Sequence, residues 1–115
     1  MSPVDGYPTE KELEQIDTWQ GTARELVEYL RTIWWAPDWG FHVKGKRILQ
    51  LELHTGGWSG NEDIIAGLQE TFLWMFSWQM SRRGGHHYFR IPFPDDKKLW
   101  WGKLGSGKQK DMGLD

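Results

Sequence analysis

The spacing of the apolar side chains changes three times along this chain. They recur every three to four residues up to Trp34, at every second residue from Phe41 to Leu53, helically again over 61–72, and alternately from Trp74. The first spacing is typical of an amphipathic helix and the second of a half-buried strand. This order predicts an α+β fold: two N-terminal helices, a β-hairpin, a helix and a β-hairpin, with an antiparallel sheet of about four strands packed on the helices.

Three runs have the pattern of a capping box, in which a Ser or Thr and a Glu three residues later satisfy free amide groups at a helix start. They are Thr9–Glu12, Thr22–Glu25 and Ser59–Glu62. The apolar spacing that follows predicts helices over about 9–17, from 22 onwards and over about 61–72. Pro37 ends the second of them, because the residue before a proline avoids the helical region.

The first predicted hairpin follows the second helix. A three-residue loop, Gly45–Arg47, pairs Val43 with Leu49 and keeps the apolar residues of both strands on one face. A two-residue turn at Gly45-Lys46 mixes apolar and polar residues on each face. We therefore expect the three-residue loop.

The second predicted hairpin turns at Gly84-Gly85, a type I′ signal, because both central residues of that turn need positive φ angles. A two-residue turn there pairs Met80 with Phe89, so that the apolar residues match. This match favours a strand over 73–81. Continuation of the third helix into the same apolar stretch is the alternative.

The length of 115 residues fits a single domain, and we expect that domain to span residues 1–94. Nine Trp, five Phe and three Tyr residues supply enough bulk for its core. After Pro94 the chain is charged and rich in glycine, apart from Leu99-Trp100-Trp101. This composition predicts a flexible tail over 95–115.

Composition and charge exclude several classes of protein. The chain has no cysteine, so disulfides and thiolate zinc sites are excluded. It has neither a signal-peptide pattern nor a long apolar run, and we expect a cytoplasmic protein with no membrane contact. Residues 1–40 hold eight acidic and three basic side chains, and residues 41–115 hold eight and eleven. The net charge of −2 disfavours a general nucleic-acid binder, whereas an acidic helical face suits a basic partner.

Residues 54–62 are the most informative stretch, because three glycines there join a strand to a helix start. Free amides at a helix N-terminus favour anions, and glycines let a ligand approach the backbone. The stretch is neither a P-loop nor a dinucleotide-binding motif, and Glu62 and the adjoining Asp63 oppose a bound anion. A tight turn before a capped helix is the alternative to ligand or partner contact. The candidate contact residues are His54, Trp58, Ser59, Asn61 and Glu62.

The predicted strands also gather polar side chains on the sheet face away from the core. The first hairpin contributes Gln50, Glu52 and His54, and the second contributes Gln79, Ser81, Arg83, His86, Tyr88 and Arg90. Arg and Tyr side chains can hold a flat or anionic ligand by paired hydrogen bonds and stacking. A solvated face, which is common in antiparallel sheets, is the alternative.

The histidines do not have the spacing of a metal site, and His86 and His87 point to opposite faces of a strand. We therefore predict no metal and no cofactor. The chain has the residue types of a hydrolytic triad, namely Ser59, a histidine (His54 or His87) and a carboxylate. The loop lacks the Gly-x-Ser-x-Gly elbow, however, so we do not expect a triad. We predict no catalytic residue and expect that the chain is not an enzyme.

Tryptophan is the other notable residue type. Trp34 lies on the apolar stripe of the second helix and is predicted to be buried. Trp35, Trp39 and Trp58 lie off the apolar stripes, and tryptophan is frequent at interface hot spots. We expect each of these three either at the edge of the core or on a contact surface.

Three runs resemble small uncharacterised proteins of bacteriophages and prophages: 7–10 (YPTE), 54–62 (HTGGWSGNE) and 81–86 (SRRGGH). The resemblance covers about residues 7–92. That group has no assigned activity and no catalytic residues to carry over. The resemblance implies a phage setting, in which small tryptophan-rich acidic proteins often bind and block or redirect host machinery.

The function expected first is that of a non-enzymatic accessory protein of phage type, which binds and modulates a host or phage protein, for instance as an inhibitor of bacterial defence. The second is capture of a small anionic or nucleotide-like ligand. The third is a small hydrolase that uses the 54–62 loop. A symmetric homodimer is left open. The ligand in the second case would contact His54, Ser59, Asn61, Arg83, Tyr88 and Arg90.

Overall fold

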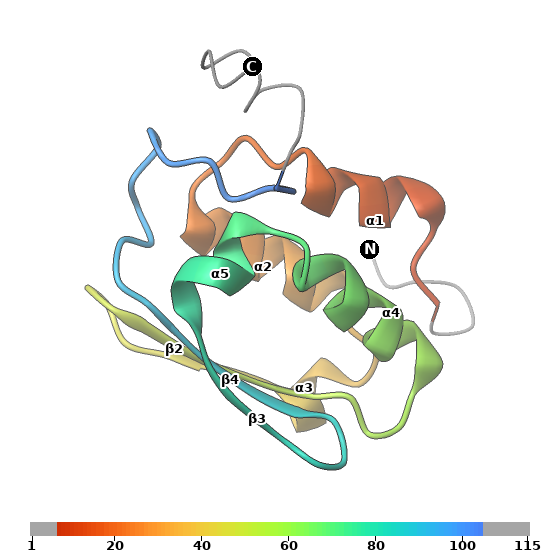
Figure 1. The fold of residues 1–115 in the computed structure, drawn as a ribbon. Helices are drawn as coiled ribbons and strands as arrows, with labels where there is room; N and C mark the ends of the chain where they lie inside the picture. The colour runs from red at the N-terminus through yellow and green to blue at the C-terminus, as the bar shows by residue number, and fades with distance from the viewer. Residues whose placement is uncertain (1–6, 105–115) are drawn as a thin grey trace.

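The computed structural model describes residues 7–104 and confirms the α+β fold. Four helices lie on one side of a four-stranded antiparallel sheet, and a short fifth helix precedes the first strand (Figure 1). The helices are α1 (Glu10–Asp17), α2 (Ala23–Ile33), α3 (Pro37–Gly40), α4 (Ser59–Leu68) and α5 (Phe72–Ser77). The strands are β1 (Phe41–Lys44), β2 (Leu49–His54), β3 (Trp78–Arg82) and β4 (His86–Ile91), in the spatial order β1-β2-β4-β3.

Two of the three predicted capping boxes are present. The side chains of Thr9 and Thr22 each accept a hydrogen bond from the backbone amide three residues on, and the glutamate there accepts one in return. The third box is wrong. Helix α4 begins at Ser59, with Trp58 before it and no side-chain cap, while the Glu62 carboxylate accepts a hydrogen bond from Thr55 Oγ1 at 3.4 Å.

The apolar stretch after α4 is a short helix followed by a strand, so neither predicted arrangement of residues 73–81 is right. The hydroxyl of Thr71 donates to the carbonyl oxygen of Leu68 at 2.6 Å, where α4 ends. The same hydroxyl accepts a hydrogen bond from Trp74 N and caps α5. The strand therefore begins only at Trp78.

The loop of the first hairpin is one residue longer than predicted and spans 45–48. Lys44 pairs with Gln50 and Leu49 has no partner in β1, so the register moves by two residues and Val43 pairs with Leu51 rather than with Leu49. Gly45 has a φ of 100°, and a Cβ there would overlap the carbonyl oxygen of Ile48, so the loop requires glycine. A shift of two residues preserves the alternation of faces, and the apolar residues of both strands still share one face.

The loop of the second hairpin also has three residues, Arg83–Gly85, instead of two. Met80 therefore pairs with Tyr88 and not with Phe89. A bulge between Trp78 and Met80 brings Trp78 opposite Phe89, and the Trp78 ring stacks on Trp74 with 5.9 Å between ring centroids. The shift of one residue moves Met80, Ser81 and Arg82 to the faces opposite those predicted, whereas the bulge keeps Trp78 on the predicted helix side.

The core lies between the sheet and the helices. Trp34 is buried, as its place on the apolar stripe predicts, and its ring meets Phe41 edge-on. The other large contributors are Leu26, Leu30 and Ile33 from α2, Leu49, Leu51 and Leu53 from β2, Ile64 and Leu68 from α4, and Phe89 and Ile91 from β4.

Residues 95–104 belong to the packed domain, so the predicted boundary at residue 94 falls too early. Trp101 is 1% exposed. Backbone hydrogen bonds tie the segment to the helices, because Phe72 N donates to Gly102 O and Lys103 N donates to Asp17 O, both at 2.8 Å. The rest of the predicted tail, 105–115, lies outside the described residues. Within residues 7–104, no helix has the length and apolar character needed to cross a membrane.

Gly85→Ala is expected to lower the free energy of unfolding by about 1–3 kcal/mol more than Gly84→Ala. Both glycines have positive φ, 80° and 90°, so the backbone strain is shared. Only at Gly85 would the new Cβ overlap the hydroxyl of buried Thr55, whereas at Gly84 it meets the movable ring of His86 at 3.2 Å. Urea unfolding followed by tryptophan fluorescence measures the difference. Equal losses would contradict the packing of this turn on Thr55.

Candidate binding surfaces

One face of the sheet points away from the four longer helices (Figure 1). We call it the open face. Its side chains form three rows across the strands: Lys44, Gln50 and Arg90; then His42, Glu52, Tyr88 and Met80; then His54, His86 and Arg82. Basic residues therefore lie at both ends of the face, and Tyr88 lies near its centre.

The register explains which predicted residues meet on the open face. Pairing of β2 with β4 places His54 opposite His86 and brings Tyr88 and Arg90 into the same face. Ser81 was expected there but lies on the helix side, where its hydroxyl is 2.7 Å from His87 Nδ1. Arg83 lies in the loop.

Three residues of the open face were missed as candidate site residues. His42, Lys44 and Arg82 belong to it by register. Lys44 shares the sequence parity of Gln50, so alternation alone provides a signal for it. Arg82 requires knowledge of the three-residue loop, whereas the Gly84-Gly85 pair indicates a two-residue turn.

A histidine cluster occupies one end of the open face. His54 Nδ1 and His86 Nδ1 are 2.7 Å apart, and His54 Nε2 is 3.5 Å from Glu52 Oε1. The ring of His42 lies 5.7 Å from that of His54, and Trp39 meets His54 edge-on at 6.2 Å. Because one imidazole must donate and the other accept, the contact between His54 and His86 needs at least one neutral ring.

Burial lowers the pKa of His54, and the neighbouring His86 and His42 lower it further, against an opposing effect of Glu52. On the helix side of the sheet, burial also lowers the pKa of His87. Both rings are therefore held in the neutral form more strongly than a free histidine.

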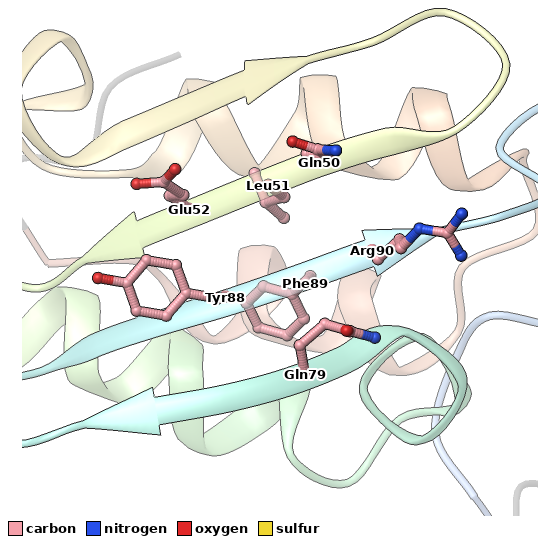
Figure 2. Close-up of a pocket in the computed structure, with 7 residues that line it drawn as sticks. All are labelled: Gln50, Leu51, Glu52, Gln79, Tyr88, Phe89 and Arg90. Carbon is pink, nitrogen blue, oxygen red and sulfur yellow. The ribbon is translucent and has the colours of Figure 1, made fainter.

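A shallow hollow of about 200 Å³ lies in the middle of the open face (Figure 2). Gln50 and Glu52 from β2, Tyr88 and Arg90 from β4 and Gln79 from β3 surround it. Pockets for small ligands usually measure about 300–1,000 Å³. The open face therefore suits an extended partner better than an enclosed small molecule.

Apart from His54, which lies on the open face, the 54–62 stretch does not form one site with that face. Asn61 is buried, and its side chain accepts from Trp35 N at 2.8 Å and donates to Trp35 O at 3.0 Å. Trp58 stacks on Trp35 with 4.7 Å between ring centroids. Within the described residues, Ser59 makes no hydrogen bond with a histidine, and no group of three His, Asp or Glu residues is arranged to hold a metal ion. Ser59 and Glu62 are exposed at the start of α4.

A second surface is apolar, and no local pattern in the sequence predicts it. Phe76 and Phe93 are 59% and 61% exposed, and Met75 and Leu99 are also exposed. An apolar hollow of about 190 Å³ lies among Phe76, Pro92, Phe93, Leu99 and Trp101. We call Phe76, Phe93 and Leu99, together with this hollow, the apolar surface. Phe76 was expected to lie in a strand, and Phe93 to end the ordered domain, so neither was considered for contact.

No family model, curated protein or solved structure matches the chain.

The free energy of unfolding is expected to fall as the pH drops from about 7.5 to 5.5. The unfolded chain binds protons at its histidines near the ordinary pKa of 6.5, whereas the folded chain binds them more weakly at His54 and His87. Protonation therefore favours the unfolded state below that pH, and the stability is fully present above it. Urea unfolding at several pH values measures the slope, which His54→Gln should reduce. A flat profile, or stability that rises on acidification, would contradict the burial of these rings.

Proposed function

We propose that this chain is a non-enzymatic accessory protein that binds a partner protein through its apolar surface. The supporting observation is the exposure of Phe76 and Phe93 beside an apolar hollow. Contiguous apolar side chains on the outside of a small protein are typical of interaction sites. Aromatic anchors of this kind supply most of the affinity at protein interfaces.

The apolar surface is held in shape by the core beneath it. Phe76 stacks on Phe72 with 5.8 Å between ring centroids and meets buried Trp101 edge-on at 6.4 Å. A ring fixed in this way loses little side-chain entropy when a partner covers it. The hollow beside it has room for one apolar side chain of the partner.

Charged residues border the apolar surface. Asp95, Asp96, Lys97 and Lys98 are exposed and lie between Phe93 and Leu99 in the sequence. Arg24 fixes one of them, because its Nε lies 2.7 Å from Asp95 Oδ1. An apolar centre with a polar rim is the usual composition of a protein interface.

The other two expected functions receive less support. The hollow on the open face is small for a captured ligand. A hydrolase would need Ser59 beside a base, and the described hydrogen bonds of His54 and His87 go to other partners, His86 and Ser81. The resemblance to phage proteins favours a host or phage protein as the partner, and inhibition of bacterial defence as the result of binding.

The proposal is tested by placing a photo-crosslinking phenylalanine at position 93 and irradiating bacterial cells that express the protein. One discrete adduct with another protein is expected, and mass spectrometry identifies it. The same probe at Gln15, which is exposed on α1, is the control and should give no such adduct. Adducts between copies of this chain only, or none, would contradict the proposal.

Phe76→Ser should then weaken binding of the identified partner by at least about 30-fold, the effect of losing an interface hot spot. Trp39→Ala is the matched variant, because Trp39 is 58% exposed but lies beside His54 at the open face. Calorimetry measures both affinities. Loss of binding with Trp39→Ala, but not with Phe76→Ser, would place the partner on the open face and overturn the proposal.

A further inference from the structure

We infer that the open face binds single-stranded nucleic acid, at a site separate from the apolar surface. The sequence disfavours such a ligand because the net charge is −2. The fold, however, separates the charges. Lys44, Arg82 and Arg90 lie on the open face with one carboxylate, that of Glu52.

The cations of the open face are available to a ligand. Within residues 7–104, none of Lys44, Arg82 and Arg90 takes part in an ion pair. All three are exposed. Further cations lie in the adjoining loops, Lys46 and Arg47 next to Lys44, and Arg83 next to Arg82. A polyanion that crosses the sheet therefore meets positive charge at both ends of the face.

An aromatic ring lies between these two basic ends, and further rings lie at the histidine end. Tyr88 occupies the central row, and the His54 ring is 6.0 Å from it. Trp39 extends the aromatic series at the histidine end, where its ring packs over Gly56. Nucleic-acid bases stack on such rings, at about 1–3 kcal/mol for each stacked base.

The side chains beside Tyr88 can pair with base edges. Gln50 and Gln79 line the same hollow and carry both hydrogen-bond donors and acceptors (Figure 2). Four strands about 4.8 Å apart give the face a width of roughly 14 Å, enough for a short run of nucleotides.

Single strands fit this arrangement better than duplexes do. Recognition of duplex DNA in the major groove uses a protruding helix or a two-stranded ribbon, whereas the open face is a four-stranded sheet. Stacking on Tyr88 also requires bases that are not already stacked on adjacent bases, as they are in a duplex. Glu52 opposes a polyanion, but its one carboxylate is outnumbered by the cations Lys44, Arg82 and Arg90 on the same face.

The inference is tested with the full chain and a fluorescently labelled single-stranded RNA of mixed sequence, about a dozen nucleotides long, by fluorescence anisotropy. Saturable binding that weakens with salt is expected, with a weaker signal for the duplex of the same sequence. Tyr88→Ala should weaken binding at least about fivefold, while Tyr88→Phe, which keeps the ring, should retain it. Arg90→Gln should weaken binding and reduce its dependence on salt.

Lys11→Gln is the matched control, because it removes a positive charge from exposed α1 on the helix side. It should leave the affinity unchanged. Absence of saturable binding, an affinity that Tyr88→Ala does not change, or an equal loss with Lys11→Gln would overturn the inference. Competition by polyglutamate as effective as that by unlabelled RNA would also overturn it, because the face would then fit an acidic protein. Phe76→Ser tests the apolar surface separately and should not affect RNA binding.

Discussion

Pairing of β2 with β4 joins two hairpins that are distant in the sequence into one sheet. Six residue pairs in register make this contact, from Leu49 opposite Ile91 to His54 opposite His86. The alternation of side chains then fixes both faces at once, since Leu51 and Phe89 enter the core while Gln50 and Arg90 point away from it. A slip of one residue would bury the polar set and expose the apolar one, so the core and the open face depend on the same register.

The fold gives the chain surfaces of different chemistry that the composition does not reveal. The net charge of −2 is the sum of negative charge on the helical side and positive charge on the open face of the sheet, so it reveals neither. The apolar surface arises where α5 meets the segment after β4, with Phe76 and Phe93 at its centre. The two proposals assign a different partner to each surface, a protein to the apolar surface and a polyanion to the open face.

Much of the fold follows from local patterns, and what fails depends on distant contacts. The boxes at Thr9 and Thr22 are local, and their helices begin as predicted. The short helix α5 depends on buried Thr71, and the order of residues 95–104 depends on Trp101 entering the core, neither of which has a periodic signature. The alternation in β2 and β4 predicts most of the open face, whereas the three-residue loop Arg83–Gly85 brings Arg82 to it. The apolar surface was missed because its residues come from two segments that only tertiary packing brings together.

The most direct test of this account is the set of NMR cross-strand nuclear Overhauser effects in the isotope-labelled protein. Contacts between backbone protons of β2 and β4 are expected in one register, with Gln50 next to Arg90 and His54 next to His86. The same spectra should show the Leu51 side chain near protons of the helices, and the Tyr88 ring remote from them. A register displaced by one residue, or β2 and β4 without mutual contacts, would contradict both the core and the open face derived from it.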